Sequence, residues 1–220
     1  MQATNVTRVL VWSRWLRLSH WSIALTAIGL CVTGLIMQSG LTSSTDISDL
    51  HNILGGLLLP PLLLRLYLLF FGKGTDHLSD CEPDKHRLSQ AWQVLRYYLT
   101  LGKAPLPKWY SHNPLWGPLY LFLFFCLFLA TASGLLLLKS LYFFAGLSML
   151  DVHQFCFLAI GILTLLHVPA VFFHDLSGQG GDVSGMINGY RIFDANPNQT
   201  GLKQGEQTIS LDDLLKTLKK

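Results

Sequence analysis

Four apolar stretches constrain the fold of this chain more than any other feature of its sequence. They cover residues 18–38, 50–72, 115–138 and 153–174. Each reaches the roughly 20 residues that a helix needs to cross a hydrocarbon core of about 30 Å. Only 13% of the residues are charged, against about 25% in soluble domains. Because only helices and closed barrels satisfy their backbone within lipid, we expect an all-α integral membrane protein, a bundle of four transmembrane helices.

The first apolar stretch could alternatively be a signal peptide. It is too long for one, carries His20, and is followed by no small-residue cleavage pattern. We therefore expect it to remain as a span. The predicted organisation is a transmembrane domain over residues 1–176 and a polar tail over 177–220.

Basic residues are unevenly distributed between the links. Lys and Arg gather before the first span, in the link 73–114 and in the tail, whereas the link 39–49 has none and the link 139–150 has only Lys139. By the positive-inside rule, both termini and the long link face the cytoplasm of a bacterial inner membrane. No feature indicates a nucleic-acid partner.

The long link contains a second helical pattern. LSQAWQVLRYYL (88–99) places its apolar residues on one face, which predicts an amphipathic helix on the cytoplasmic membrane surface. Asn113 and Pro114 suit the N-cap and first position of the third span. Pro60, Pro61 and Pro169 predict local bends. SLDDLLKTLKK (210–220) has the pattern of a short amphipathic helix.

Four histidines lie within the spans, where an ionisable residue is a functional candidate by default. His153 and His167 are fourteen positions apart, which is about 21 Å and nearly four turns, so they share one helix face at two depths. The direction of each span places His51 with His153 near the outer surface, and His20 with His167 near the inner surface. For any single histidine, the alternative is a ring bonded to a neighbouring carbonyl or lying near the headgroups.

Two histidines at each level, from two different helices, are what bis-histidine ligation of haem iron requires. We therefore predict two b-type haems, held non-covalently because no CxxCH motif is present. A zinc ion would need more ligands, closely clustered. A proton relay would favour mixed carboxylates, which the spans almost lack, but a proton conductor or transporter stays as the alternative from another class.

The fourteen-residue interval recurs on the first two spans. Gly34 follows His20 by fourteen positions, and its missing side chain leaves room for the outer haem. Arg65 follows His51 by fourteen positions, so its guanidinium suits a propionate of the inner haem. Arg17 is a second propionate candidate. The alternative for Arg65 is a side chain that reaches lipid phosphates.

Motifs over residues 8–193 resemble one known family, the dihaem b-type cytochrome subunits of membrane-bound [NiFe] hydrogenases, with relatives among formate dehydrogenase gamma subunits and thiosulfate reductase cytochrome subunits. The motifs that carry the resemblance are RLSHW (17–21), VTG (32–34), HNILGG (51–56), RLYLLFFG (65–72), WQVLRYYL (92–99), SHNP (111–114), TASGLLL (131–137), HD (174–175) and MINGYR (186–191). The resemblance implies that residues 1–176 form a cytochrome b domain and that the tail is cytoplasmic. It also implies the same four iron ligands, His20 with His167 and His51 with His153.

In that family, electrons enter at the outer haem from an iron–sulfur protein and leave to a quinone near the inner haem. The resemblance therefore makes four residues candidates for a quinone site: Arg65, His112, Asn113 and His174. A plain helix start is the alternative role for Asn113 and Pro114.

The expected function is electron transfer between a periplasmic redox partner and the quinone pool, by a subunit of an oxidoreductase complex with quinone reductase activity. The outer links are shorter than those of hydrogenase cytochrome subunits, so the donor is either hydrogenase-like or another periplasmic or membrane-anchored iron–sulfur subunit. We expect a hetero-oligomer, with a dimer of the chain as a further option. A haem-only conduit without a quinone site is the alternative.

Overall fold

The computed structural model describes the chain except for residues 1–5, 41–44, 83, 177–180, 195–205 and 210–220. It divides into two compact units: Leu18–Leu166, and Met1–Arg17 together with His167–Lys220. Each unit is described by itself below. The predicted amphipathic helix at 210–220 lies outside the described residues.

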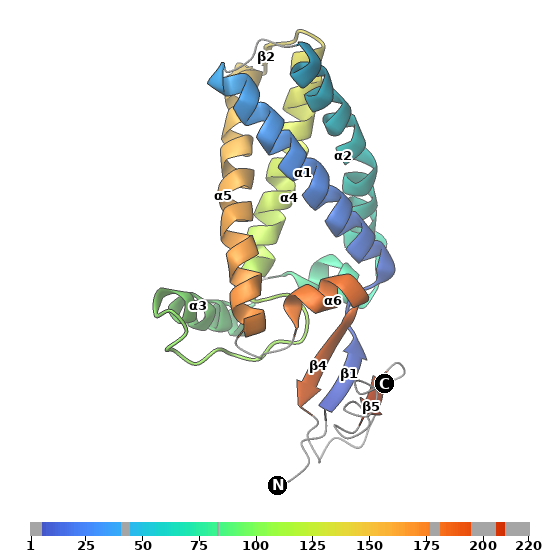
Figure 1. Ribbon diagram of the computed structural model, residues 1–220, viewed down its shortest axis with the longest axis vertical. Coiled ribbons are helices and arrows are strands. Elements are labelled where there is room, and N and C mark those ends of the chain that lie inside the picture. The colour runs from blue at the N-terminus through green and yellow to red at the C-terminus, as the bar shows by residue number, and fades with distance from the viewer. Residues whose placement is uncertain (1–5, 41–44, 83, 177–180, 195–205, 210–220) are drawn as a thin grey trace. The chain divides into compact units, whose positions relative to one another are not determined.

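Four long helices dominate the described residues (Figure 1), and each is long and apolar enough to cross a membrane. This confirms the predicted four-span, multi-pass membrane fold. The helices begin one to five residues from the predicted starts, and α2 and α5 continue through their internal prolines. Their bounds are α1 Arg14–Ser39, α2 Thr45–Phe71, α4 Trp116–Leu138 and α5 Met149–Leu176.

The core of the larger unit lies between α2, α4 and α5. Its buried residues are small or branched apolar side chains and one aromatic ring, which pack at helical spacing: Leu58, Leu62, Phe124, Cys126, Leu127, Cys156 and Ile160. Large apolar side chains on the other faces of these helices are exposed, as Leu63 at 58% and Phe125 at 57% illustrate. Apolar residues on the outside suit a lipid surrounding, in which they need no protein cover. All four cysteines are free thiols.

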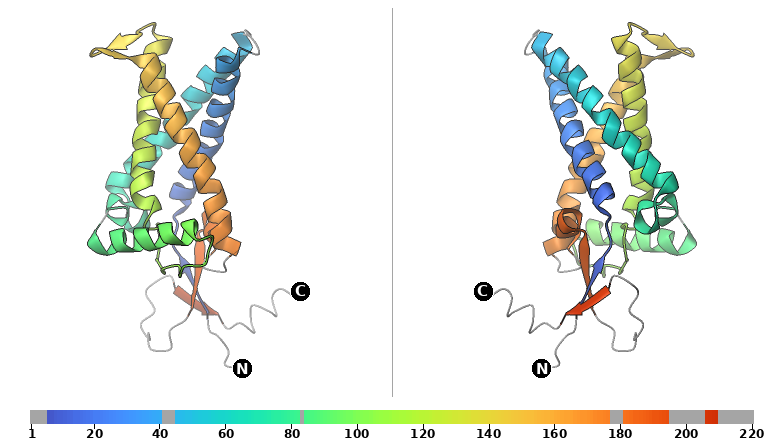
Figure 2. Two further views of the ribbon diagram at one scale, coloured as in Figure 1. Left: turned by 90° about the vertical axis from the view of Figure 1, so that its left-hand side faces the viewer. Right: turned by 90° about the vertical axis from the view of Figure 1, so that its right-hand side faces the viewer.

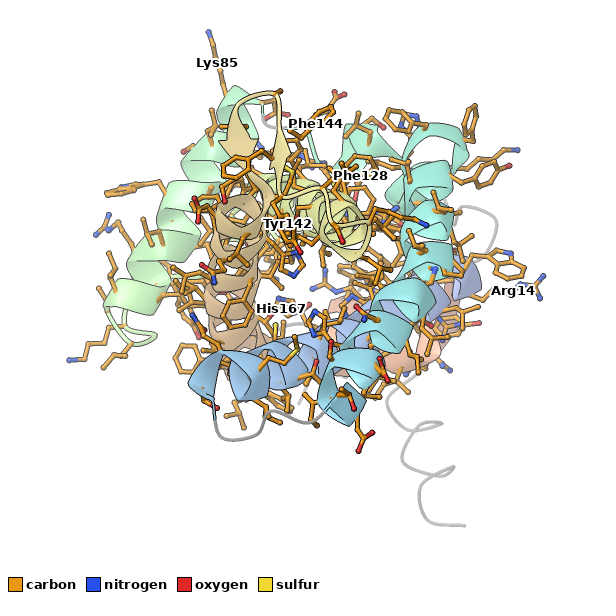
Figure 3. All side chains as sticks on the ribbon, turned by 90° about the horizontal axis from the view of Figure 1, so that it is seen from above. Arg14, Lys85, Phe128, Tyr142, Phe144 and His167 are labelled. Atoms are coloured by element: carbon orange, nitrogen blue, oxygen red, sulfur yellow. The ribbon has the colours of Figure 1, made fainter. Side chains whose placement is uncertain are left out.

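The link between α4 and α5 forms a small hairpin that the sequence analysis did not predict. Strands β2 (Phe143–Phe144) and β3 (Leu147–Ser148) pair across Ala145 and Gly146, which both have positive φ, as a two-residue type I′ turn requires. Figure 2 shows this hairpin at one end of α4 and helix α3 at the other. Tyr142, Phe143 and Phe144 are at least 60% exposed, and Figure 3 looks down on this end of the larger unit. Exposed aromatic rings are typical of a membrane–water interface.

The long link contains two 3₁₀ turns, η1 (Gly74–Asp76) and η2 (Leu78–Asp80), followed by α3 (Lys85–Leu99). The carboxylate of Asp84 caps α3 by accepting a 2.7 Å hydrogen bond from the amide of Arg87. Val94 and Tyr97 are buried, whereas the apolar side chains of Leu88, Trp92 and Leu99 are exposed. The predicted amphipathic helix is therefore present, and its exposed apolar face suits a membrane surface.

The smaller unit contains a three-stranded antiparallel sheet, which was not predicted from the sequence. Strand β1 (Val6–Leu10) lies between β4 (Tyr190–Asp194) and β5 (Glu206–Ile209), with Arg8 opposite both Ile192 and Gln207. Helix α6 (Asp182–Asn188) precedes β4. The sheet joins segments from both ends of the sequence, so no local sequence pattern predicts the pairing of β1 with β4 and β5.

Candidate functional site

His51 on α2 and His153 on α5, which were paired from the sequence, lie next to each other. Their ring centroids are 6.1 Å apart, with 67° between the ring planes. Two imidazoles on opposite sides of one iron need centroids about 6 Å apart, because each metal–nitrogen bond is about 2 Å and each ring centre lies about 1 Å further. The spacing of this pair therefore fits ligation of one haem iron.

A hydroxyl group from a neighbouring helix contacts each of these rings at Nδ1. Thr33 Oγ1 on α1 is 2.8 Å from His51 Nδ1, and Ser133 Oγ on α4 is 3.2 Å from His153 Nδ1. The carbonyl oxygen of Ala130 is a second partner of His153 Nδ1, at 2.9 Å. Both rings are thus fixed through Nδ1, and Nε2 of each is the nitrogen that remains for a metal.

A glycine follows each of these hydroxyl residues and lets the histidine ring approach the helix backbone. A Cβ atom added at Gly34 would lie 3.6 Å from Cε1 of His51, and one added at Gly134 would lie 3.2 Å from Cε1 of His153. The predicted haem-packing residue Gly34 is therefore beside one of the predicted ligands. Four helices contribute to this site, which fits a planar group held between helices.

His20 and His167 belong to different units, so their pairing as ligands stays a prediction. Both side chains are half-buried, and the ring of His20 packs edge-on against Trp21 at 5.4 Å; Figure 3 labels His167. Arg17, the second propionate candidate, donates from Nη1 to the carbonyl of Ile187. Its buried Nε atom has no hydrogen-bond partner among the described residues.

Arg65 is buried within the larger unit, which does not fit a side chain that reaches for lipid phosphates. It is 3% exposed, donates from Nη1 to the carbonyl of Asp76 at 2.9 Å, and lies 5.1 Å from the ring centroid of Tyr120. Its Nη2 atom is buried and has no hydrogen-bond partner among the described residues. A buried guanidinium with a spare donor suits a ligand oxygen.

His112 joins the same region through Tyr120, whose ring centroid is 6.0 Å from its own. Its Nδ1 atom is 2.6 Å from Asp80 Oδ2, and the hydroxyl of Ser111 donates to that oxygen at 2.5 Å. Burial alone would lower the pKa of His112, but its hydrogen bonds to Asp80 and Cys81 hold that pKa above its ordinary value. Burial alone would raise the pKa of Asp80, but hydrogen bonds from His112 and Ser111 hold it below its ordinary value. Both shifts favour the ion-paired form of His112 and Asp80.

Asn113 does not cap α4 in the predicted way. The helix begins at Trp116, and the side-chain oxygen of Asn113 accepts a 3.0 Å hydrogen bond from the amide of Leu115, which is an Asx-turn. Its Nδ2 atom is buried and has no hydrogen-bond partner among the described residues. Like Arg65 Nη2, this is a spare donor near the start of α4.

His174 lies in the smaller unit, and its role at a quinone stays a prediction. It is 1% exposed, and its Nδ1 atom is 3.2 Å from Asp182 Oδ2. Arg191 contacts the other oxygen of that carboxylate at 3.1 Å. Asp175 accepts hydrogen bonds from the first amides of α6. The HD and NGYR motifs therefore tie the end of α5 to α6 and β4.

The sequence analysis assigned no role to Thr33, Ser133, Gly134 and Tyr120. A signal for them exists: a hydroxyl residue followed by glycine occurs at 33–34 and again at 133–134. Tyr120 lies fourteen positions before Gly134, so α4 repeats the interval of the other three helices. The repeated hydroxyl–glycine pair and the repeated fourteen-residue interval, and not any single residue, distinguish these positions.

Comparisons with known proteins identify the family of this chain. The family model for prokaryotic cytochrome b561 matches residues 11–189. The chain is 28% identical to the probable Ni/Fe-hydrogenase B-type cytochrome subunits of Azotobacter vinelandii and Azotobacter chroococcum mcd 1, over 85% of this chain and 90% of each relative. No solved structure matches the chain. Because the family model covers most of its length, including all four helices that could span a membrane, the chain belongs to the prokaryotic cytochrome b561 family.

Proposed function

We propose that this chain is a dihaem cytochrome b subunit that carries electrons between a redox partner on the outer side of the membrane and the quinone pool. Membership of a cytochrome b family implies b-type haem and electron transfer. The observation that carries the proposal is the His51–His153 pair, two imidazoles from different helices whose centroids are 6.1 Å apart. Hydroxyl groups on Nδ1 of both rings leave Nε2 directed to ligation.

His51 and His153 would hold the outer haem, and His20 and His167 the inner haem. The bound haems supply one-electron transfer, and the protein supplies ligands, spacing and a dry surrounding. Since α5 provides one ligand to each haem, its fourteen-residue interval sets the two irons about 21 Å apart along the helix. Electrons would then cross most of the membrane in one step between two sites.

The quinone site would lie around the start of α4. Arg65 Nη2 and Asn113 Nδ2 are buried donors without a partner among the described residues, and a quinone carbonyl would accept from such donors. The protonated ring of His112, held on Asp80, would supply a proton to the reduced quinone. A haem propionate is a second oxygen ligand for Arg65. A cytoplasmic position for this end would let quinone reduction consume cytoplasmic protons.

The redox partner would be an iron–sulfur subunit, either hydrogenase-like or of another kind. The names of the Azotobacter relatives favour a hydrogenase. We further propose a place in the bacterial inner membrane with both termini cytoplasmic, because the basic residues gather in the terminal segments and in the link that contains α3.

Haem content tests the proposal most directly. We expect the purified protein to show the α-band of low-spin b haem in reduced-minus-oxidised spectra. His153→Ala should lose about half of that haem, because one of two bis-histidine sites loses a ligand. His86→Ala, at an exposed histidine next to the start of α3, is the matched control and should keep all of it. A wild-type protein without a b-haem band would refute the proposal.

A further inference from the structure

The two hydroxyl groups at the outer pair do more than contact the rings. Thr33 Oγ1 lies 2.9 Å from the carbonyl of Gly29 and 3.1 Å from that of Leu30, and donates to these acceptors. Ser133 Oγ likewise donates to the carbonyls of Leu129, at 2.7 Å, and Ala130, at 3.1 Å. A hydroxyl has one hydrogen, and the helix carbonyls can only accept it, so a hydrogen bond to the helix leaves the oxygen of each hydroxyl as an acceptor.

The direction of the contact with histidine follows from this. With its hydrogen on a helix carbonyl, Thr33 Oγ1 would accept at the 2.8 Å contact with His51, which would place the proton of that ring on Nδ1. The carbonyl of Ala130 leads to the same result for His153, because a carbonyl oxygen has no hydrogen to donate. A neutral imidazole has one N–H, so Nε2 of both rings presents its lone pair.

We propose that Thr33 and Ser133 are positioning residues that fix the Nδ1-protonated tautomer of His51 and His153, and so set the ligand strength of the outer haem site. This inference rests on the proposed function, since it takes the two histidines as iron ligands. An acceptor on Nδ1–H makes the imidazole a stronger donor at Nε2, which favours the oxidised iron. Removing the acceptor should therefore raise the midpoint potential and weaken haem binding.

His51 and His153 differ in the number of acceptors at Nδ1, so the two hydroxyl groups should differ in importance. Among the described residues, His51 Nδ1 has the Thr33 hydroxyl as its acceptor, whereas His153 Nδ1 has both Ser133 and the Ala130 carbonyl. Loss of the Thr33 hydroxyl leaves Nδ1–H of His51 without an acceptor. Loss of the Ser133 hydroxyl leaves the backbone carbonyl in place, so its effect should be smaller.

The test uses Thr33→Val and Ser133→Ala in the full chain. Each has a matched control on the same helix that removes a hydroxyl bonded to helix carbonyls: Thr26→Val on α1 and Thr131→Val on α4. The readouts are a redox titration followed at the α-band, the electron paramagnetic resonance signal of the oxidised low-spin iron, and the haem-to-protein ratio. The inner haem, which His51→Ala should keep, shows in each variant that the protein is folded.

We expect Thr33→Val to raise the midpoint potential of the outer haem and to weaken its binding about 10-fold. Ser133→Ala should shift the potential in the same direction by less, both controls should match the wild type, and Thr33→Ser should restore the wild-type potential. If His51→Ala and His153→Ala each remove one haem but neither hydroxyl variant differs from its control, the inference is overturned and the proposed function stands. If the two alanine variants keep both haems, the proposed function itself fails.

Discussion

The larger unit contains two kinds of histidine site, which differ in the groups that contact the imidazole ring. His51 and His153 face hydroxyl and carbonyl oxygens at Nδ1, which in our proposal fix the tautomer that presents Nε2 to a metal. His112 instead faces the carboxylate of Asp80, whose hydrogen bond outweighs the effect of burial and holds the pKa of the ring above its ordinary value. A neutral imidazole can bind iron, whereas an imidazolium can donate a proton. The neighbouring group, and not the histidine, decides between these roles.

Exchanging one histidine from each site for alanine should separate the roles most strongly. We expect His51→Ala to lose about half of the b haem, as His153→Ala does, and with it electron entry from the outer side. His112→Ala should keep all the haem, but its reduced form should transfer electrons to a quinone analogue on the order of 100-fold more slowly, because a proton donor is missing. Haem content and single-turnover oxidation by the analogue measure the two effects.

A loss of haem in His112→Ala would contradict the assignment of different roles to the two sites, since it would place His112 among the iron ligands. Unchanged quinone reduction in His112→Ala would show that His112 is not the proton donor. A wild-type protein that does not reduce the quinone analogue would favour the alternative of a haem-only conduit. His86→Ala, at an exposed position, is again the control for general effects of removing an imidazole.

The pH dependence of the His112–Asp80 pair should have a smaller but more specific effect. The raised pKa of His112 stabilises the folded state fully below about pH 6.5, and this contribution is lost as the pH rises through the folded value. The lowered pKa of Asp80 stabilises the folded state above about pH 4 and is lost as the pH falls through its folded value. The pair therefore stabilises the fold most between about pH 4 and 6.5.

Asp80→Asn removes that carboxylate and should leave the pKa of His112 lower than in the wild type. In thermal melts, the difference in melting temperature between the wild type and Asp80→Asn should be largest in the same pH window and should decrease at lower and at higher pH. Quinone reduction by the variant should decline at lower pH than in the wild type. Ser111→Ala, which removes one hydrogen bond to Asp80 but keeps the ion pair, should shift both profiles less. Identical pH profiles for the wild type and Asp80→Asn would show that the pair has no part in proton supply.

The four spans and the proximity of His51 to His153 could be predicted from the sequence because both follow from helix geometry. Apolar length defines a span, and a rise of about 1.5 Å per residue turns the interval between His153 and His167 into a depth. The structure places His51 beside His153 and Gly34 beside His51, as that geometry requires. Local periodicity was therefore sufficient for the helices and for the proximity of His51 to His153.

What the sequence did not predict depends on contacts between distant segments. Asp80 and His112 meet from opposite ends of the long link, outside the periodic pattern of α3, and β1 pairs with β4 from the other end of the chain. Thr33 and Ser133 were missed for another reason. Hydroxyl side chains in helices commonly bond to their own backbone, so only the neighbouring helix reveals their second partner.

The two glycines of the outer site should give the smallest effects, and they test whether the histidine ring or the haem fills the space beside each. At Gly134→Ala, the new Cβ would lie 3.2 Å from His153 Cε1, so a ring held by Ser133 and Ala130 must yield by a few tenths of an ångström. At Gly34→Ala, the distance to His51 Cε1 is 3.6 Å, an ordinary contact. If the rings alone matter, Gly134→Ala should weaken haem binding severalfold, and Gly34→Ala should have almost no effect in the same haem titration. The opposite order would mean that the haem macrocycle packs against Gly34, as the missing side chain there predicts from the sequence, and that the outer site is shaped more by α1 than by α4.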